Sequence, residues 1–254
     1  MTRPVVAAVA TLVAATASLA AGAALPAHPI SAGAVALPIT AAAAALPTTA
    51  RMAACPSNQA WHAPAGADVV KIPAAAVRDD QMWAGGWTKV PTSTAPWSAL
   101  VWDEDDWSQS IISAGQGVIT YRAVVPADGT YRWSAKMAAP HETDWNDFWV
   151  RFPAGVNQQR HGGLSWAGDG WLKIYSNRGG MAFVWGGGTI DHDPHMLLTR
   201  WMAAGSVVEF QISGRSRQVA LAAFGLHPCA IEGNGSPECV RLDQMQEAAT
   251  ATCY

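Results

Sequence analysis

Three segments in the middle of the chain alternate apolar side chains with aromatic or polar ones at a period of two. In the first segment, Phe148 and Val150 fall on one side, and Trp149 and Arg151 fall on the other. This periodicity is typical of β-strands that pack on one face only. The pattern therefore predicts a sheet with one apolar face and one face of aromatic rings, cations and amides. The three segments are 146–152, 170–175 and 181–185.

Short strands separated by turn residues are expected along most of the folded region. Many short strands with regular turns predict an all-β fold, a jelly-roll β-sandwich in a single domain. The connection 124–131 holds Pro126, Asp128 and Gly129, which favour a tight turn, and it is predicted as a β-hairpin. The expected strands are 68–72, 99–102, 117–125, 129–138, 147–152, 171–176, 182–186, 197–202, 206–213 and 218–226.

The N-terminal residues differ sharply in composition from the rest of the chain. Arg3 precedes a run of Ala, Val, Leu and Thr with small residues after it, which is typical of a secretory signal peptide. The run is too weakly apolar for a membrane span, and the expected location is secreted or extracellular. An organelle transit peptide is the alternative, because no acidic residue precedes Asp68, although Arg is scarce there. The expected division is a signal peptide over 1–27, an Ala- and Pro-rich low-complexity spacer over 28–54, the β-sandwich over 55–230 and a Cys-containing tail over 231–254.

The four cysteines lie on either side of the Trp-rich region. An even count after a secretion signal favours disulfides, and four cysteines allow three pairings. We expect Cys229 with Cys239, closing a short loop, and Cys55 with Cys253, tying the ends of the domain together. The C-x-x-C spacing of a zinc site does not occur.

Charge and acidic motifs narrow the range of partners. The net charge is -3 and the chain has no basic stripe, so nucleic-acid binding is not expected. The runs 103–106 and 191–195 hold residues that bind calcium or zinc in other proteins. Neither has the spacing of an EF-hand or the ligand set of a complete metal site, and solvated loops are the better interpretation. A structural calcium ion in the sandwich is the one cofactor that stays open.

Four stretches, in order, resemble a known family. They are GVITYRAVVPADGTYRWSAKM, HETDWNDFWVRFP, GWLKIYSN and VVEFQISGRSRQVALAAFGL. Their order is similar to that of the galactose-binding-like jelly rolls that serve as non-catalytic carbohydrate-binding modules of secreted and cell-surface proteins. The resemblance covers residues 68–227 and implies the same fold and a glycan ligand. Ala222 stands where such modules often carry an Asp in the last strand, so a contact made by that Asp has no counterpart here.

The polar-aromatic face supplies the candidate ligand site. Sugar recognition needs a flat ring for the C–H face of the sugar and planar polar groups for adjacent hydroxyls. Trp149, Trp171 and Trp185 are the predicted platform. The alternative is that these rings fill a second small core and that the polar residues before them only form turns. The expected polar partners are His141, Asn146, Asp147, Arg151, Lys173 and Asn177.

These features predict a secreted, non-catalytic module that binds a glycan or polysaccharide. One alternative is a secreted lyase or glycosidase centred on residues 141–147. No nucleophile motif or phosphate-binding loop supports catalysis. Another alternative is an extracellular structural or adhesion protein whose aromatic face binds other extracellular proteins.

Overall fold

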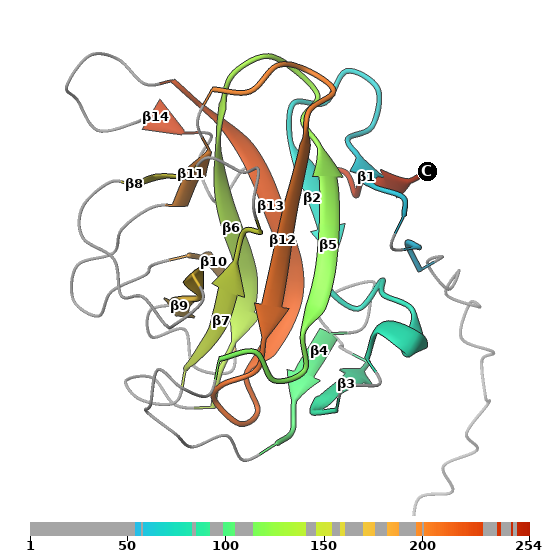
Figure 1. Ribbon diagram of the computed structural model, residues 1–254, viewed down its shortest axis with the longest axis vertical. Coiled ribbons are helices and arrows are strands. Elements are labelled where there is room, and N and C mark those ends of the chain that lie inside the picture. Colours follow the sequence, from blue (N-terminus) through green and yellow to red (C-terminus); the bar gives the residue numbers. More distant parts are fainter. Residues whose placement is uncertain are drawn as a thin grey trace, which may run out of the picture. The chain divides into compact units, whose positions relative to one another are not determined.

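The computed structural model is almost entirely β, with two sheets (Figure 1). The residues that it describes belong to one compact unit, Leu46–Tyr254. A short 3-10 helix, η1 (Asp79–Gln81), follows β2 (Val70–Pro73). The described residues are 54–56, 58–82, 85–91, 99–104, 114–140, 146–153, 158–160, 170–175, 182–187, 197–199, 201–230, 238–239, 245 and 248–254.

The first sheet, here called sheet A, has six strands in the order β15-β1-β5-β12-β7-β9. Its central strand β12 is antiparallel to both neighbours, whereas β1 and β5 run parallel. The order places segments far apart in sequence side by side, so the outer face of the sheet combines residues from distant parts of the chain. The strands are β1 (Trp61–His62), β5 (Ile119–Val124), β7 (Asp147–Arg151), β9 (Leu172–Tyr175), β12 (Val207–Ser213) and β15 (Thr252–Cys253).

The second sheet, sheet B, has the order β3-β4-β13-β6-β11-β8, with β10 on β6 and with β2 and β14 on β13. The long strands β6 and β13 pair along most of their length and form its centre. The strands are β2 (Val70–Pro73), β3 (Trp87–Val90), β4 (Ala99–Trp102), β6 (Thr130–Ala138), β8 (Gln158–Arg160), β10 (Val184–Gly186), β11 (Leu197–Thr199), β13 (Ala220–Ala230) and β14 (Glu238–Cys239).

Consecutive strands from β4 to β9 alternate between sheet B and sheet A. This alternation is the jelly-roll arrangement, so the predicted all-β sandwich is confirmed. The predicted hairpin over 124–131 is wrong, because β5 lies in sheet A and β6 in sheet B. The connection between β5 and β6 is short, but it carries the chain from one sheet to the other. Turn residues fix the local bend, whereas the partner of the next strand depends on contacts distant in sequence.

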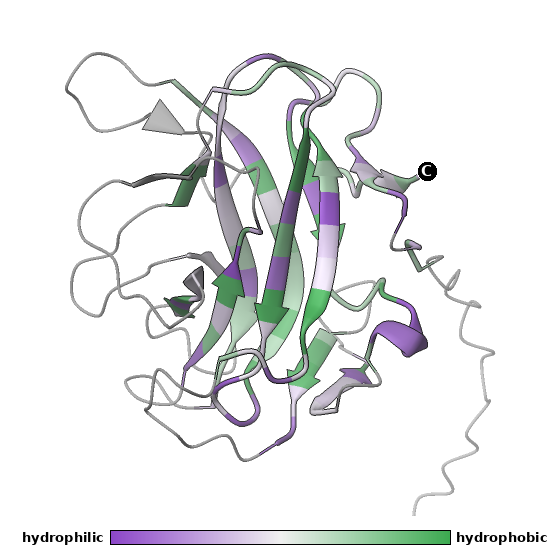
Figure 2. Cartoon of the chain, viewed as in Figure 1, coloured by the Kyte–Doolittle hydropathy of each residue, from purple (hydrophilic) through white to green (hydrophobic). Residues whose placement is uncertain are grey.

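A core of large apolar side chains joins the two sheets. Phe210 of β12 packs edge-on against Trp133 of β6 with ring centroids 5.6 Å apart, and Tyr121 of β5 packs on Phe224 of β13 at 4.8 Å. Hydrophobic and hydrophilic bands alternate along β12 in Figure 2, as expected of a strand with one face inside. The predicted apolar faces of β7 and β9 are confirmed as part of this core, with Phe148, Val150, Leu172 and Ile174 fully buried.

The two ends of the sandwich domain are tied together. A disulfide joins Cys55 to Cys253, as predicted. Cys229 is also disulfide-bonded, and Cys239 lies opposite it in the β13–β14 register. The C-terminal tail thus adds strands to both sheets. No helix in the described part of the chain is both long enough and apolar enough to span a bilayer.

Candidate functional site

The outer face of sheet A, which points away from the core, carries most of the predicted site. Three side chains form a line across this face, which we call the polar row: Thr120 on β5, Gln211 on β12 and Arg151 on β7. Gln211 lies directly opposite Thr120 on one side and Arg151 on the other. Side chains of directly opposed residues share a face, so the register alone brings these three together.

Hydrogen bonds and a stacked ring hold the polar row in place. Gln211 Nε2 donates to Thr120 Oγ1 at 3.0 Å, and Arg151 Nε donates to Gln211 Oε1 at 2.6 Å. The Arg151 guanidinium lies over the Trp171 ring, 4.6 Å from its centroid. Within the described residues, neither terminal nitrogen of Arg151 has a hydrogen-bond partner. The guanidinium is therefore fixed in orientation while part of its donor fork stays free.

The two tryptophans predicted as a platform are buried. Trp149 is 3% exposed and Trp171 is 2% exposed, and they form a small cluster with Ala114 and Val118. A guanidinium covers each ring, since Arg215 lies 5.2 Å from the Trp149 centroid. Neither ring face is open to a sugar, so the alternative interpretation, a second small core, describes these two residues. The period-two alternation predicts that both rings lie on the outer face, but it does not predict that other side chains cover them.

Asp147 is the centre of a buried ionic cluster. Its carboxylate forms a salt bridge with Arg215 and a longer one with Lys173 at 3.7 Å. Ser216 Oγ donates to Asp147 Oδ1 at 2.5 Å, and the Ser216 backbone N–H donates to the Asp147 carbonyl at 3.1 Å. The cluster joins β7 to the turn that follows β12. Asn146 beside it is also buried. The Asp147 carboxylate is therefore engaged within the protein and is not free for a ligand.

Trp185 lies in the other sheet. Its strand β10 pairs with β6, where Trp185 is opposite Lys136. Its ring lies beside Gly225 of β13, close to Met245 from the C-terminal tail. The prediction of one platform made of Trp149, Trp171 and Trp185 is therefore wrong. Alternation indicates which face of a strand a residue occupies, but the choice of sheet depends on long-range pairing. His141 and Asn177 lie outside the described residues.

Sequence reasoning missed several residues that build this face. Gln211 is not among the predicted site residues, although the alternation over 207–213 already places it on the outer side of its strand. Arg215 and Ser216 fall within the last of the four stretches that carry the family resemblance, but neither is among the predicted site residues. The missing information was the strand order, which brings β12 between β5 and β7.

The acidic motifs give no metal centre in the part of the chain that the structure describes. No group of three or more His, Cys, Asp or Glu side chains gathers there in a way that could hold an ion. Asp103 and Glu104 are exposed, and the cluster 191–195 lies outside the described residues. The structural calcium ion stays a prediction.

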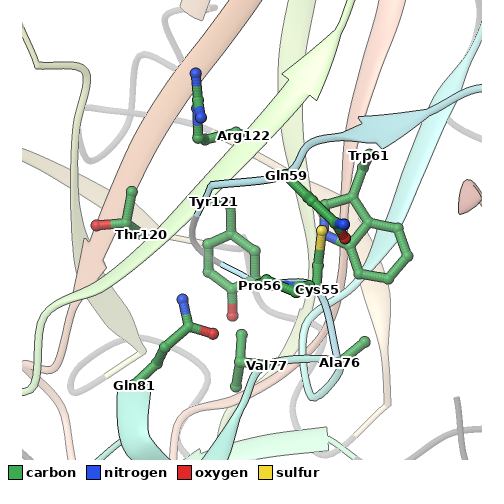
Figure 3. Close-up of a pocket in the computed structure, with 10 residues that line it drawn as sticks. All are labelled: Cys55, Pro56, Gln59, Trp61, Ala76, Val77, Gln81, Thr120, Tyr121 and Arg122. Carbon is green, nitrogen blue, oxygen red and sulfur yellow. The ribbon is translucent and has the colours of Figure 1, made fainter. Parts of the chain in front are cut away.

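A small cavity lies beside Cys55, between Trp61 and Tyr121 (Figure 3). Its volume is about 10 Å³, which is room for about one water molecule. The Tyr121 hydroxyl donates to the Ala74 carbonyl at 2.7 Å, and burial raises the pKa of Tyr121 well above its ordinary value of 10.0. This cavity is too small for a sugar.

The fold and this face define an all-β jelly-roll sandwich with a polar outer surface on one sheet. No protein-family model and no curated protein matches the chain. Among solved structures, it is similar to the C-terminal CBM6 of LamC, a laminarinase from Zobellia galactanivorans. That match has 13% identity and a TM-score of 0.37, and it covers 62% of this chain and 98% of the other. A second match, to the GH26-CBM35 β-(1,4)-mannanase of Podospora anserina, has 13% identity and a TM-score of 0.36. It covers 66% of this chain but only 29% of the mannanase.

Proposed function

We propose that this protein is a secreted, non-catalytic carbohydrate-binding module that binds a glycan on the outer face of sheet A. The observation that carries the proposal is the Arg151 guanidinium, which is oriented by Gln211 and Trp171 and keeps free donors. A planar group with several fixed N–H donors matches pairs of adjacent sugar hydroxyls. Preorganisation lowers the entropic cost of binding, because the side chain does not have to be ordered by the ligand.

Further planar polar groups continue the site along the same strands. Arg122 of β5 and Glu209 of β12 lie opposite each other, with Arg122 Nε 3.7 Å from Glu209 Oε2. Both side chains are about one-third exposed, at 33% and 39%, so this pair contributes little to stability and is available for hydroxyls. In this proposal Trp171 supports Arg151 from below, instead of stacking on the sugar itself.

A secreted location is part of the proposal. The Cys55–Cys253 disulfide fits an oxidising compartment. It also agrees with a signal peptide ahead of the sandwich domain. Other extracellular proteins are the alternative partners of the same face.

The test is a glycan array probed with the purified full chain, once with calcium and once with a chelator. Arg151→Lys keeps the positive charge but removes the planar fork. Arg78→Lys is the matched control, because Arg78 is exposed and pairs with Asp80 instead of with the polar row. We expect wild type and Arg78→Lys to bind the same glycan class. Arg151→Lys should lose about tenfold or more in affinity, as expected for a charge-assisted hydrogen-bond pair.

Two results would contradict this function. If the wild-type protein binds no glycan on the array, glycan binding is contradicted. If Arg151→Lys and Arg78→Lys bind equally well, the polar row is not the binding site. Release of reducing ends from a bound polysaccharide would show an enzyme. Loss of binding in the chelator would establish a role for calcium, and unchanged binding would exclude one.

A further inference from the structure

A second opening lies at the far end of the outer face of sheet A. This edge hollow has a volume of about 510 Å³ and is bounded by residues 62–68, the turn 124–127, Gly205 and Tyr254. The segments that bound it lie near one another in Figure 1: the loop between β1 and β2, the upper end of β5 and the C-terminus. Its volume is within the range of small-ligand sites.

An anchored aromatic ring forms one wall of the edge hollow. Tyr254 stacks on His62 with centroids 3.9 Å apart and an interplanar angle of 11°. Its backbone exchanges two hydrogen bonds with Ala60, and the neighbouring Cys253 is held by the disulfide. Tyr254 is nevertheless 65% exposed. The ring is thus fixed from behind and open on its other side, as a stacking surface for a sugar requires.

A carboxylate with unused acceptor capacity lies in the same hollow. Asp68 lines it, and within the described residues the Asp68 carboxylate has no hydrogen-bond or ion-pair partner. An ionised carboxylate accepts several hydrogen bonds and suits a pair of adjacent hydroxyls. Its negative charge disfavours an anionic sugar by like-charge repulsion. The chemistry therefore selects a neutral ring with vicinal hydroxyls.

The remaining walls are rigid and apolar. The Tyr131 hydroxyl donates to the Ala127 carbonyl at 2.9 Å and accepts from the Ala127 N–H at 3.2 Å. The Gly205 N–H donates to the Val125 carbonyl at 2.9 Å. These bonds fix the two turns that face the ring. Small side chains on both turns and on the 62–68 loop leave the space unfilled.

The edge hollow and the polar row lie along the same face of β5. Val124 of β5 lies opposite both His62 and Val207 in the register. The same face of β5 continues through Arg122 to Thr120, four residues away, or about 14 Å along the strand. One glycan chain that follows β5 could therefore contact both places.

We infer that the edge hollow is a second sugar subsite, which holds one neutral pyranose residue with its C–H face on Tyr254 and its adjacent hydroxyls on Asp68. This inference rests on the proposed function and extends it by a named sugar class and a second set of residues. The subsite binds a single residue by itself, whereas the polar row contributes to a longer chain.

The test uses three simple probes with the full chain: methyl β-D-glucopyranoside, methyl β-D-galactopyranoside and methyl α-D-mannopyranoside. Saturation-transfer-difference NMR would measure the contact of each with wild type, Tyr254→Ala, Asp68→Asn and Trp201→Ala. Trp201 is the matched aromatic control, because it is also 65% exposed but does not line the hollow. Circular dichroism checks the fold of each variant, and the nearly isosteric Asp68→Asn keeps the test valid if Tyr254→Ala unfolds.

We expect transfer to at least one pyranoside, lost in Tyr254→Ala and reduced about fivefold or more in Asp68→Asn, the size expected for a lost charge-assisted hydrogen bond. Trp201→Ala should give the wild-type signal. No transfer to any of the three probes, or equal loss in Trp201→Ala, would overturn the inference. If array binding still depends on Arg151 in that case, the proposed function stands and only the second subsite fails. If neither the array nor the NMR experiment detects binding, both the proposed function and the second subsite are contradicted.

Discussion

The two ends of the outer face of sheet A use aromatic and acidic residues in opposite ways. At one end, Trp149 is buried beneath a guanidinium, and Asp147 is engaged by Arg215, Lys173 and Ser216. At the other end, Tyr254 is largely exposed and Asp68 has no partner in the described structure. Both ends contain the ring and carboxylate that a sugar site needs. Only at the second end are the ring face and the carboxylate oxygens unused within the protein. This difference separates a stabilising cluster from a ring and carboxylate that are able to bind a sugar.

The largest expected effect is the difference in stability loss between a buried tryptophan, Trp149, and an exposed one, Trp201. Trp149→Ala should lower the free energy of unfolding by about 3–5 kcal/mol, because it removes a buried ring and leaves a cavity. Trp201→Ala should change it by about 0.5 kcal/mol or less, as usual for an exposed side chain. Urea denaturation of the two variants beside wild type measures both values. Equal stability of the two variants would show that Trp149 does not belong to the core, and the comparison would fail.

An intermediate effect on stability is expected when Asp147 at one end of the outer face is replaced, and almost none when Asp68 at the other end is replaced. Asp147→Asn keeps the side-chain volume but leaves two poorly exposed cations, Arg215 and Lys173, without their carboxylate. We expect a loss of about 2–3 kcal/mol, somewhat below the value for a fully buried pair, because both cations retain some solvent contact. Asp68→Asn should cost about 0.5 kcal/mol or less and affect sugar binding instead.

Chemical denaturation in low and high salt decides this second prediction. A mostly buried cluster is screened weakly, so the loss in Asp147→Asn should persist in high salt. If Asp68→Asn destabilises the protein as much as Asp147→Asn, then Asp68 has a structural role and is not a free binding group.

The faces of the strands could be predicted from the sequence, but their neighbours could not. Phe148 and Trp149 were placed on the correct sides because alternation is a local property of an extended chain. The sheet that holds Trp185 depends on pairing of β10 with β6, more than 40 residues apart, for which no local signal exists. The hairpin prediction for 124–131 was wrong for the same reason, since its residues specify a bend but not which sheet the next strand joins.

Exposure was the second quantity that the sequence did not reveal. Trp149 and Tyr254 are both aromatic residues in or beside strands, yet one is buried and the other is open. The Trp149 ring is covered by Arg215, from a turn more than 60 residues away. The Cys55–Cys253 pair was predicted correctly because the two cysteines flank the whole sandwich. That disulfide also holds Tyr254 beside the edge hollow.

The smallest expected effect concerns the frame of the edge hollow. Tyr131→Phe removes the hydroxyl that bridges the N–H and carbonyl of Ala127, and we expect a loss of about 1 kcal/mol at neutral pH. Burial, together with the nearby Asp68 and Asp128 carboxylates, raises the pKa of Tyr131 above its ordinary value of 10.0.

The raised pKa gives the prediction a sign in alkaline solution. Above pH 10.0 the phenol ionises in the unfolded chain before it does so in the folded protein, so the unfolded state binds fewer protons and stability falls as pH rises. The stability of Tyr131→Phe should fall less steeply than that of wild type over this pH range. Urea midpoints at about pH 8, 10 and 11 measure the difference, and Tyr121 contributes equally in both proteins. Parallel curves would mean that the Tyr131 hydroxyl does not brace the turn. Weaker pyranoside binding by Tyr131→Phe at neutral pH would show that the exposed end depends on a buried frame, even though its own binding groups are free.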